Sequence, residues 1–403
     1  MKAGRRPAGL ATHGQAHEVV SGENWGHRLV GRRGGQPRPP TCLEASPFTT
    51  NLQLAKMKRI VCVGAVYIDT ILTVPHFPIE DQKLRATKLA RRRGGNCANT
   101  LEVLQQLVEE APHSQKLRKS HSAQDDAELY LISVLPARRS DAARYILDSL
   151  SGVELDRACI FREGPTEAAA SYIINNKEHD TRTIISINEL PEMTPDEFLH
   201  QNLEISADSD STWYHFEGRM PDITNVCIQQ LRSSPDFRHS KISIECEKPE
   251  RRGLTSIVQH ADVVFYSRLW AESYGYQSAE DFLQSELGKE DLRTNALLCC
   301  TWGAAGATIV QNTPGRSPVW ASTKAWKNGD DTEQSPIVDS IGAGDTFVAG
   351  MLFALNYHQD DWDLQQKLQF ANELAGRKVY QEGFNGLGKA ISTAAKSCEI
   401  KAT

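Results

Sequence analysis

The sequence predicts an α/β fold in which a mainly parallel central sheet lies between two layers of helices, with a small second β-sheet attached. Three observations support this prediction. Short apolar runs typical of buried strands alternate with helical stretches from Met57 onwards. Two alternating β stretches, at 171–174 and 182–185, are joined by a polar turn and indicate a hairpin. The 403 residues, with 40% hydrophobic and 24% charged side chains, can bury a large core without disulfide bonds.

The elements follow in chain order. Strands are predicted at 58–64, 129–132, 241–244, 263–265 and 296–299, and helices at 100–108, 142–150 and, with an amphipathic pattern, 346–355. Strand–helix alternation of this kind is typical of a parallel sheet that is covered on both faces. Two polar segments, 109–128 and 191–211, are expected to be surface insertions.

The first 56 residues differ from the rest of the chain. They carry eight Lys or Arg against three Glu, a net charge of +5, which leaves −11 for the remainder because the whole chain carries −6. We expect residues 1–56 to be a disordered basic extension, or to lie upstream of the true start at Met57, and residues 57–403 to fold. An Arg-rich, acid-poor start also fits a mitochondrial presequence, an alternative that we disfavour against a cytoplasmic protein.

Composition also argues against several classes of protein. No run approaches the ~18 consecutive apolar residues of a transmembrane helix, so we expect no membrane partner. An acidic folded part is not the kind of surface that binds nucleic acid. Nine cysteines without Cys-x-x-Cys spacing indicate neither a zinc site nor a fully paired disulfide framework, which favours a reducing compartment.

The strongest chemical signal is the run D-S-I-G-A-G-D-T-F at 339–347. A series of small residues opens a helix there, and backbone N–H groups at a helix start attract anions. Asp345 places a carboxylate at the same point. This arrangement suits phosphoryl transfer, because the carboxylate can take a proton from an alcohol while the N–H groups hold the phosphoryl group. The alternative is a glycine-rich turn in which Asp345 only caps the helix.

A second motif consists of two glycines and two asparagines, Gly94, Gly95, Asn96 and Asn99. The two asparagines are three residues apart and therefore share one face of a helix. Asparagine side chains both donate and accept hydrogen bonds, as recognition of a polyhydroxylated ligand requires. The alternative is an ordinary helix start with Asn96 as its N-cap.

Three further features are weaker when taken singly. Asp69 is expected to end the first strand, at the sheet edge where α/β proteins bind ligands, although it would also suit a turn. The loop at 301–306 follows a strand and is suited to a nucleotide phosphate. Arg182 on the predicted hairpin could reach a phosphate or a sugar, whereas a lone surface arginine is usually only solvated.

Together these motifs resemble the signatures of the PfkB, or ribokinase, family of carbohydrate kinases, from Met57 to about Gly388. Residues 339–345 match the signature D-T-x-G-A-G-D except for Ser340 in place of Thr, and residues 94–99 match G-G-N-x-x-N. The loop at 301–306 is similar to the family's T-x-G-x-x-G nucleotide loop. Two segments, HFEGR at 215–219 and IECEKP at 244–249, are most similar to family members that phosphorylate fructose.

The resemblance implies a ribokinase-like three-layer sandwich with a β lid formed by segments near 66–93 and 165–190. It implies transfer of a phosphoryl group from ATP to a primary hydroxyl of a sugar, fructose before others, with Mg²⁺ and with room for a monovalent cation such as K⁺. A homodimer through the lid is expected, because an exposed sheet face needs cover. Two alternatives stay open: a family kinase for another sugar or a nucleoside, and a non-catalytic sugar-binding regulator on the same scaffold.

The resemblance also assigns roles by position. Asp345 is expected to be the general base, beside an anion hole made by Gly342, Ala343 and Gly344. The residues expected to hold the sugar are Asp69, Gly95, Asn96, Asn99 and Arg182, with Asp81 contributed by a partner subunit. The residues expected to hold the nucleotide are Thr301, Gly303, Gly306, Gly383 and Asn385. Glu247 is expected to lie near magnesium and the phosphates.

Some positions depart from the family pattern or imitate another one. Residues 267–270 (SRLW) stand where many members carry N-x-x-E, which leaves the metal ligands open. Residues 383–390 read G-x-x-x-x-G-K-A, close to a P-loop, but Ala390 lacks the hydroxyl that binds magnesium. We interpret this run as a loop at the nucleotide edge or a helix start. Cys97 is expected to be a small buried residue rather than a redox switch.

Overall fold

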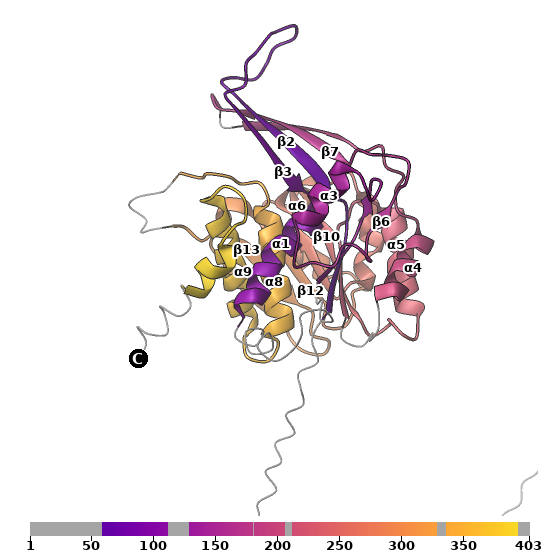
Figure 1. Cartoon of the computed structure of the whole chain (residues 1–403). Coiled ribbons are helices and arrows are strands. Elements are labelled where there is room, and N and C mark those ends of the chain that lie inside the picture. Colours follow the sequence, from indigo (N-terminus) through magenta and orange to yellow (C-terminus); the bar gives the residue numbers. More distant parts are fainter. Residues whose placement is uncertain (1–58, 112–128, 180, 206–211, 329–335, 394–403) are drawn as a thin grey trace, which may run out of the picture. The chain divides into compact units, whose positions relative to one another are not determined.

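A computed structural model describes residues 59–111, 129–179, 181–205, 212–328 and 336–393 (Figure 1). The expected extension at 1–56 lies outside the described residues, as do nearly all of the polar segment 109–128 and the end of 191–211. The described residues all belong to one compact unit. No helix in these ranges is long and apolar enough to span a membrane.

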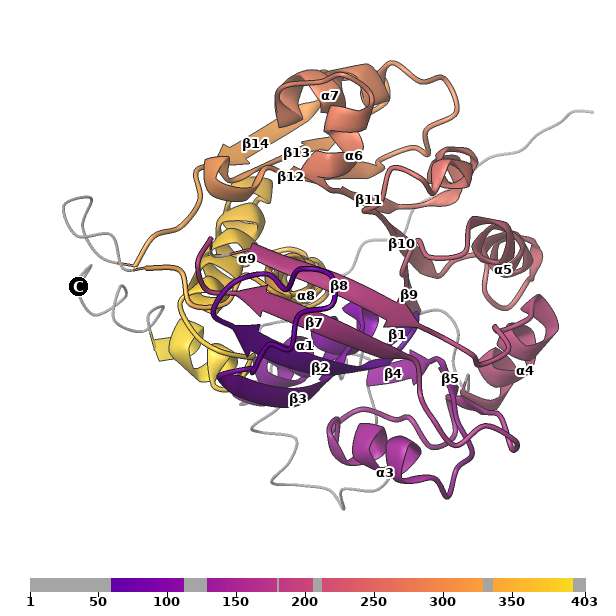
Figure 2. The same cartoon turned by 90° about the horizontal axis from the view of Figure 1, so that it is seen from above.

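An eight-stranded sheet forms the centre of this unit, in the order β14-β13-β12-β11-β10-β9-β1-β4 (Figure 2). Its strands are β1 (Arg59–Val63), β4 (Leu129–Ile132), β9 (Thr212–Phe216), β10 (Lys241–Cys246), β11 (Val263–Tyr266), β12 (Leu297–Thr301), β13 (Ala307–Gln311) and β14 (Val319–Thr323). The six strands from β4 to β12 pair in parallel, and β13 and β14 pair antiparallel at one edge. The prediction of a mainly parallel sheet is therefore confirmed.

Helices cover both faces of this sheet, because successive side chains of a strand point to opposite sides. The helices are α1 (Asn96–Glu110), α3 (Asp141–Asp148), α4 (Pro195–Ile205), α5 (Pro221–Ser233), α6 (Arg268–Ser273), α7 (Ala279–Leu287), α8 (Ala343–Tyr357) and α9 (Leu364–Val379). On one face Ile60 and Cys62 belong to a buried cluster that includes residues of α1, α8 and α9. On the other face Val61 and Val63 join a cluster with residues of α4, α5 and α7. Figure 2 shows α8 and α9 on one side of the sheet and α4 and α5 on the other.

The second sheet has four strands in the order β3-β2-β7-β8. They are β2 (Tyr67–Val74), β3 (Lys88–Gly94), β7 (Ala170–Asn176) and β8 (Thr181–Ile187). The predicted hairpin is present, because β7 and β8 pair antiparallel. We call this four-stranded sheet the lid sheet. Its strand β3 leads directly into α1, which connects it to the layers around the central sheet (Figure 1). Short elements complete the fold: β5 (Val134–Leu135), β6 (Ile160–Phe161), η2 (Arg252–Ser256), η3 (Val258–His260) and η4 (Gly303–Ala305).

Three expectations about local structure were wrong. Asp69 does not end the first strand: β1 stops at Val63, and Asp69 lies inside β2 of the lid sheet. The described part of the segment 191–211 is not a surface insertion, because residues 195–205 form α4, whose Phe198 is fully buried against the sheet. The helix α8 is not amphipathic: nearly every side chain from Thr346 to Ala354 is buried, since α1 and α9 pack on it as well as the sheet.

Candidate active site

A cavity of about 440 Å³ opens where the lid sheet, the carboxyl ends of the central strands and the first turns of α1 and α8 meet. Ligands of open α/β sheets bind at this edge of the sheet. Ten of the predicted site residues line the cavity, here called the sugar pocket: Asp69, Gly95, Asn96, Asn99, Arg182, Glu247, Thr301, Gly342, Gly344 and Asp345. Residues more than 250 positions apart in the sequence are thus brought together as the motifs predict.

The turn before α8 is shaped by a glycine in the left-handed region. Gly342 is the N-cap of α8 with φ 81°, and a Cβ atom there would lie 2.3 Å from the Phe384 ring. Any other residue would be strained and would push that ring away. Around Gly344 the space is open, because no described atom lies within 4 Å of where its Cβ would stand. The first turn of α8 therefore borders an open cavity, and N–H groups at a helix start attract anions.

Asp345 is the third residue of α8, and its carboxylate faces the sugar pocket. The side-chain amide of Asn99 donates to its Oδ2 at 2.7 Å. Desolvation raises the pKa of Asp345 well above its usual value, repulsion from Glu245 and Glu247 adds to the rise, and the Asn99 hydrogen bond opposes it. A carboxylate with a raised pKa is a stronger base, which suits proton removal from an alcohol. Its position also rules out the alternative of a mere helix cap, because Gly342 is the N-cap.

The two asparagines of α1 share one face, as predicted, but each contacts a different carboxylate. Asn96 donates to Glu245 Oε2 at 2.9 Å and to Glu247 Oε2 at 3.2 Å. Asn99 accepts a hydrogen bond from Arg93 at 2.6 Å, and this contact turns its amide nitrogen toward Asp345. The N-cap of α1 is Gly95 with φ 106°, where a Cβ would lie 2.2 Å from the Ala65 carbonyl oxygen. Asn96 is therefore not the N-cap, and its side chain is available to the pocket.

Sequence reasoning gave no role to two carboxylates that line the sugar pocket, Glu217 and Glu245. Glu245 lies near the carboxyl end of β10 and contacts the buried His215 ring at 3.0 Å. Glu217 follows β9 and accepts a hydrogen bond from the Ala65 N–H at 2.9 Å. Burial, with repulsion from Glu245, raises the pKa of Glu217 to about 7. Both glutamates stand at the end of an apolar strand, where α/β proteins bind ligands. In predicting the site from the sequence, we used this pattern only for Asp69.

The carboxylates of Glu245 and Glu247 are suited to hold a magnesium ion. Both carboxylates reach the same Asn96 nitrogen, and burial together with repulsion from Glu245 raises the pKa of Glu247. A cation between them would relieve that repulsion. Among the described residues no preformed group of three or more His, Cys, Asp or Glu could hold a metal. Mg²⁺ is commonly held by one or two carboxylates together with substrate phosphates, so this pair fits an ion that is shared with a nucleotide.

A second cavity of about 520 Å³ adjoins the sugar pocket and is here called the nucleotide pocket. The two share Thr301, Ser340, Gly344 and Phe347, so they meet at the first turn of α8. The nucleotide pocket is lined by the predicted Thr301, Gly303, Gly306, Ala343 and Gly344, and by aromatic and small residues that include Trp326, Gly376 and Tyr380. Gly306 has φ 104°, and a Cβ there would lie 1.9 Å from the Thr323 carbonyl oxygen. Flat apolar walls beside a glycine loop suit a purine base and its phosphates.

Three predicted residues lie elsewhere. Asp81, with φ 62°, is exposed in the loop between β2 and β3 and is not among the residues that line either pocket. Gly383 lines a separate cavity of about 370 Å³ under the lid sheet, and Asn385 does not line the nucleotide pocket. The run at 383–390 follows α9 rather than a strand, so it lacks the strand–loop–helix context of a P-loop.

The lid sheet is joined by two arginines to the turn at 339–344, which is expected to bind phosphate and is called the phosphate-binding turn below. Arg182 on β8 donates to Ser340 Oγ at 2.7 Å, and Arg92 on β3 donates to Asp339 Oδ2 at 3.1 Å. The Arg92 Nε also lies 4.0 Å from the carboxylate of Asp69. Burial raises the pKa of Asp69, and the charge of Arg92 opposes this rise. Asp69 and the turn before α8 are therefore linked through the side chain of Arg92.

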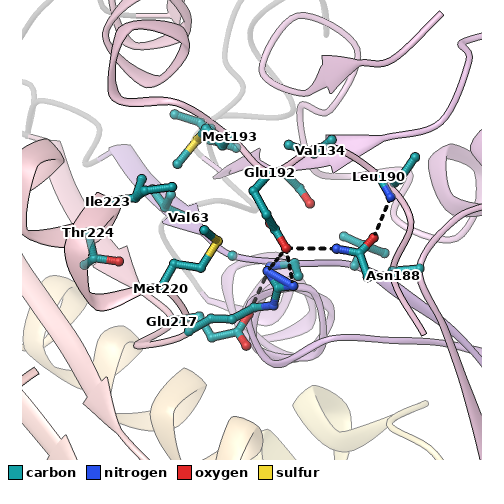
Figure 3. A pocket seen from close by; sticks show the side chains of 17 residues that line it. Val63, Val134, Asn188, Leu190, Glu192, Met193, Glu217, Met220, Ile223 and Thr224 are labelled. Carbon is teal, nitrogen blue, oxygen red and sulfur yellow. Dashed lines mark hydrogen bonds and ion pairs between the residues drawn. The ribbon is translucent and has the colours of Figure 1, made fainter. Parts of the chain in front are cut away.

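A much smaller cavity of about 60 Å³ lies on the other side of Glu217 (Figure 3). Its walls come from the carboxyl ends of β1, β4 and β9, from the start of α5, and from the segment that contains Asn188 and Glu192. Arg219 and Asn188 both donate to Glu192 Oε1, and the buried Ser133 hydroxyl has no hydrogen-bond partner among the described residues. The space suits ordered water rather than a sugar, because one water needs ~10–15 Å³ by this measure.

The comparisons with known proteins agree with this geometry. The family model for pfkB family carbohydrate kinase matches residues 57–387. Ketohexokinase of Mus musculus is 26% identical over 334 residues, which cover 82% of this chain and 99% of the mouse protein.

Solved structures agree in fold at low identity. Ribokinase from Giardia lamblia superposes with a TM-score of 0.63 at 15% identity, over 85% of this chain and 99% of the other. Ribokinase of Arabidopsis thaliana complexed with ribose and ATP gives a TM-score of 0.60 at 16% identity, over 84% and 99% of the two chains. The three-layer ribokinase-like fold is thereby confirmed, and the chain belongs to the pfkB family of carbohydrate kinases, which are ATP-dependent phosphotransferases with an alcohol as acceptor.

Proposed function

We propose that the protein is a ketohexokinase, which transfers the γ-phosphoryl group of ATP to the 1-hydroxyl of fructose. The observation that carries this proposal is the position of Asp345, whose carboxylate faces the sugar pocket at the helix start where the nucleotide pocket begins. Support for fructose comes from sequence: the 26% identity to mouse ketohexokinase extends over 99% of that protein, and residues 215–219 and 244–249 share the pattern of fructose-phosphorylating members.

In the proposed reaction Asp345 accepts the proton of the sugar hydroxyl. The oxygen then attacks the γ-phosphorus in line, and the bond from that phosphorus to the β,γ-bridging oxygen breaks with its electron pair leaving on ADP. The carboxylate is suited to this step because its pKa is raised by desolvation and by neighbouring carboxylates. Asn99 holds Oδ2, which leaves Oδ1 to face the substrate.

The negative charge of the migrating phosphoryl group would be stabilised by the first turn of α8 and by Arg182. Gly342, Ala343 and Gly344 supply the backbone N–H groups, and Arg182 already contacts the same turn through Ser340. Mg²⁺ bound with ATP would neutralise part of the phosphate charge, with Glu247 and Glu245 as the carboxylates that would hold it.

The sugar would be held by groups on three sides of its pocket. Asp69 reaches down from β2, and Asn96 and Asn99 reach in from α1, so that both donors and acceptors meet the hydroxyl groups. Gly95 lets the chain pass close to Ala65 at the wall of the pocket, where a side chain would strike the Ala65 carbonyl.

We further propose a homodimer formed through the outer face of the lid sheet. Among the strand residues that point away from the sugar pocket, four are large, apolar and exposed: Leu89 by 67%, Tyr172 by 50%, Ile185 by 58% and Ile187 by 50%. Tyr172 and Ile185 are direct cross-strand neighbours, so their side chains form a continuous surface. A second copy would cover it, and Asp81 of the partner subunit would then reach the sugar pocket.

A substrate panel tests the choice of sugar. ADP release is measured with fructose and other ketoses, with ribose and other aldoses, and with nucleosides, each at the same concentration and with Mg-ATP. Fructose is expected to give the highest kcat/KM, and phosphate on its 1-hydroxyl identifies the product. Preference for ribose or a nucleoside would overturn the ketohexokinase proposal, and sugar binding without any ADP release would favour a non-catalytic regulator.

Replacing the base tests the mechanism. Asp345→Asn keeps the size of the side chain but cannot accept the proton, so kcat is expected to fall by ~10²–10⁴-fold. Sugar and ADP binding, followed by calorimetry, should stay within a few fold of the parent, since the pocket walls are unchanged. A variant that keeps more than a tenth of the parental kcat would contradict the role of Asp345.

A further inference from the structure

The side chain of Lys378 on α9 is completely buried, yet the reaction scheme above gives it no part. Its ammonium donates to the Asp339 carbonyl at 2.9 Å, to Asp339 Oδ2 at 2.8 Å and to the Gln381 carbonyl at 3.4 Å. Three oxygens thus match the three protons of the group. A charge in this position is tolerated only because it is paired and hydrogen-bonded.

Asp339, its main partner, begins the phosphate-binding turn. Asp339 Oδ1 accepts from the Ile341 N–H at 2.9 Å, which closes the first part of the turn. Its other oxygen accepts from Arg92 as well as from Lys378, so the start of the turn is fixed between the lid sheet and α9. A displaced Asp339 would carry the following residues with it, because only Ser340 and Ile341 separate it from Gly342.

Lys378 also reaches the end of the same turn, through an aromatic ring. Its ammonium lies 5.4 Å from the centre of the Phe384 ring, within the range of a cation–π contact. That ring packs against Gly342, so closely that a Cβ on Gly342 would lie 2.3 Å from it. One buried cation therefore supports both Asp339, where the turn starts, and Gly342, where α8 starts.

We propose that Lys378 is a positioning residue: its ammonium acts as a built-in monovalent cation that holds the turn from Asp339 to Gly344 in the shape that receives the phosphoryl group. It occupies a shell of carbonyl and carboxylate oxygens of the kind that binds a monovalent ion. It touches neither sugar nor nucleotide pocket, so its effect passes through the backbone of the turn. The inference rests on the phosphoryl-transfer role proposed for this turn, but not on the identity of the sugar.

The chain offers a matched control on the same helix. Lys367 is also buried, at 7% exposure, and its ammonium donates to the carbonyls of Gln359 and Trp362. It lies about three turns earlier on α9 and is not among the residues that line the two pockets. Replacing it removes a buried ammonium from backbone carbonyls without changing the phosphate-binding turn.

The experiment compares Lys378→Met, Lys378→Ala, Lys367→Met and Lys367→Ala in the full chain, with the best sugar from the panel. We expect the Lys378 variants to lose about 10²-fold in kcat, since a small misplacement of the groups around the reacting atoms costs about this much. Affinity for the sugar alone should change little. The Lys367 variants should keep kcat within twofold, although they too lose stability on heating.

Added ammonium or potassium ions show whether the Lys378 variants lose activity because the positive charge is missing or because the packing has changed. Lys378→Ala leaves room for a small cation among the freed oxygens and should regain at least several-fold in kcat, whereas Lys378→Met fills the space and should not respond. Equal losses in the Lys367 and Lys378 variants, or no response of Lys378→Ala to either ion, would overturn the proposal.

Two further measurements keep the test decisive if the Lys378 variants do not fold or if the sugar has been wrongly identified. If neither Lys378 variant folds, Asp339→Asn removes the carboxylate from the same shell, and it must then lower kcat in the same way. Binding of a fluorescent ADP analogue without sugar reports on the turn when the sugar has been wrongly identified, so failure of the ketohexokinase proposal is distinguishable from failure of this one.

Discussion

At the scale of single residues, the reactivity of Asp345 depends on the group that faces its second oxygen. Asn99 stabilises the charged carboxylate and so lowers a pKa that burial and neighbouring carboxylates raise. Arg93 fixes which end of the Asn99 amide points at Asp345, because it donates to the Asn99 oxygen. Asn99 and Arg93, which precede Asp345 by about 250 positions, thus keep this carboxylate a strong base that can still ionise.

We predict that Asn99→Ala moves the acidic limb of the pH–rate profile to higher pH. The parental kcat/KM should rise with pH as Asp345 loses its proton, and loss of the Asn99 hydrogen bond raises the pKa of Asp345 further. The measurement is kcat/KM across pH 5 to 9 at saturating Mg-ATP. Asn96→Ala is the matched control, since it removes a donor from Glu245 and Glu247 instead; a limb that stays in place in Asn99→Ala would contradict the argument.

The same residues show how far the sequence could predict the site. Asp345, Asn96 and Asn99 lie in compact motifs whose chemistry can be recognised without a structure. Glu217 and Glu245 have no such motif, because their proximity arises only from neighbouring parallel strands that end at one edge of the sheet. Pairing between β9 and β10 cannot be derived from either strand alone.

At the scale of elements, the start of α8 depends on one residue, Gly342. Gly342→Ala is expected to lower the free energy of unfolding by about 1–2 kcal/mol for the left-handed backbone and by about 1–3 kcal/mol more for contact with the Phe384 ring. Chemical denaturation measures the change. Gly275→Ala is the control: it shares a left-handed backbone, φ 88°, but apart from its chain neighbours nothing described lies within 4 Å of its Cβ position, so the backbone cost alone should appear.

Elements of the central sheet were predictable where their apolar runs were continuous, as in β1, β4 and β11. The helix α4 was missed because a polar surface dominates its sequence, whereas only three of its residues, Phe198, Asn202 and Ile205, are buried. Asp69 was misplaced for a related reason: the chain leaves β1 after Val63 and enters β2 after only three intervening residues. Nothing in the residues marks this passage from one sheet to another.

At the scale of the whole molecule, an acidic chain must bind an acidic substrate. The chain from residue 57 onwards carries −11, and several of these charges face the sugar pocket. Overall charge therefore opposes ATP binding, and in the proposed mechanism the attraction would come from the first turn of α8, from Arg182 and from a metal bound with ATP. Burial, together with repulsion from Glu245, raises the pKa values of Glu217 and Glu247 in this pocket.

The outer face of the lid sheet supplies the prediction about assembly. Ile185→Asp places a charge in the middle of the exposed apolar face, so it should raise the dimer dissociation constant by at least tenfold in sedimentation experiments. The monomer itself should unfold at nearly the same temperature, since substitutions at exposed sites usually change stability by less than ~0.5 kcal/mol. Leu269→Asp is the control, because Leu269 on α6 is 62% exposed but lies outside the lid.

Activity should follow assembly only if Asp81 acts across the interface. Asp81→Ala is expected to remain dimeric and to lose sugar affinity, whereas Ile185→Asp should lose activity in proportion to its monomer fraction. Raising the protein concentration would then restore the specific activity of Ile185→Asp but not that of Asp81→Ala. A parental protein that sediments only as a monomer at micromolar concentration, or a fully active Ile185→Asp monomer, would show that each chain forms a complete site by itself.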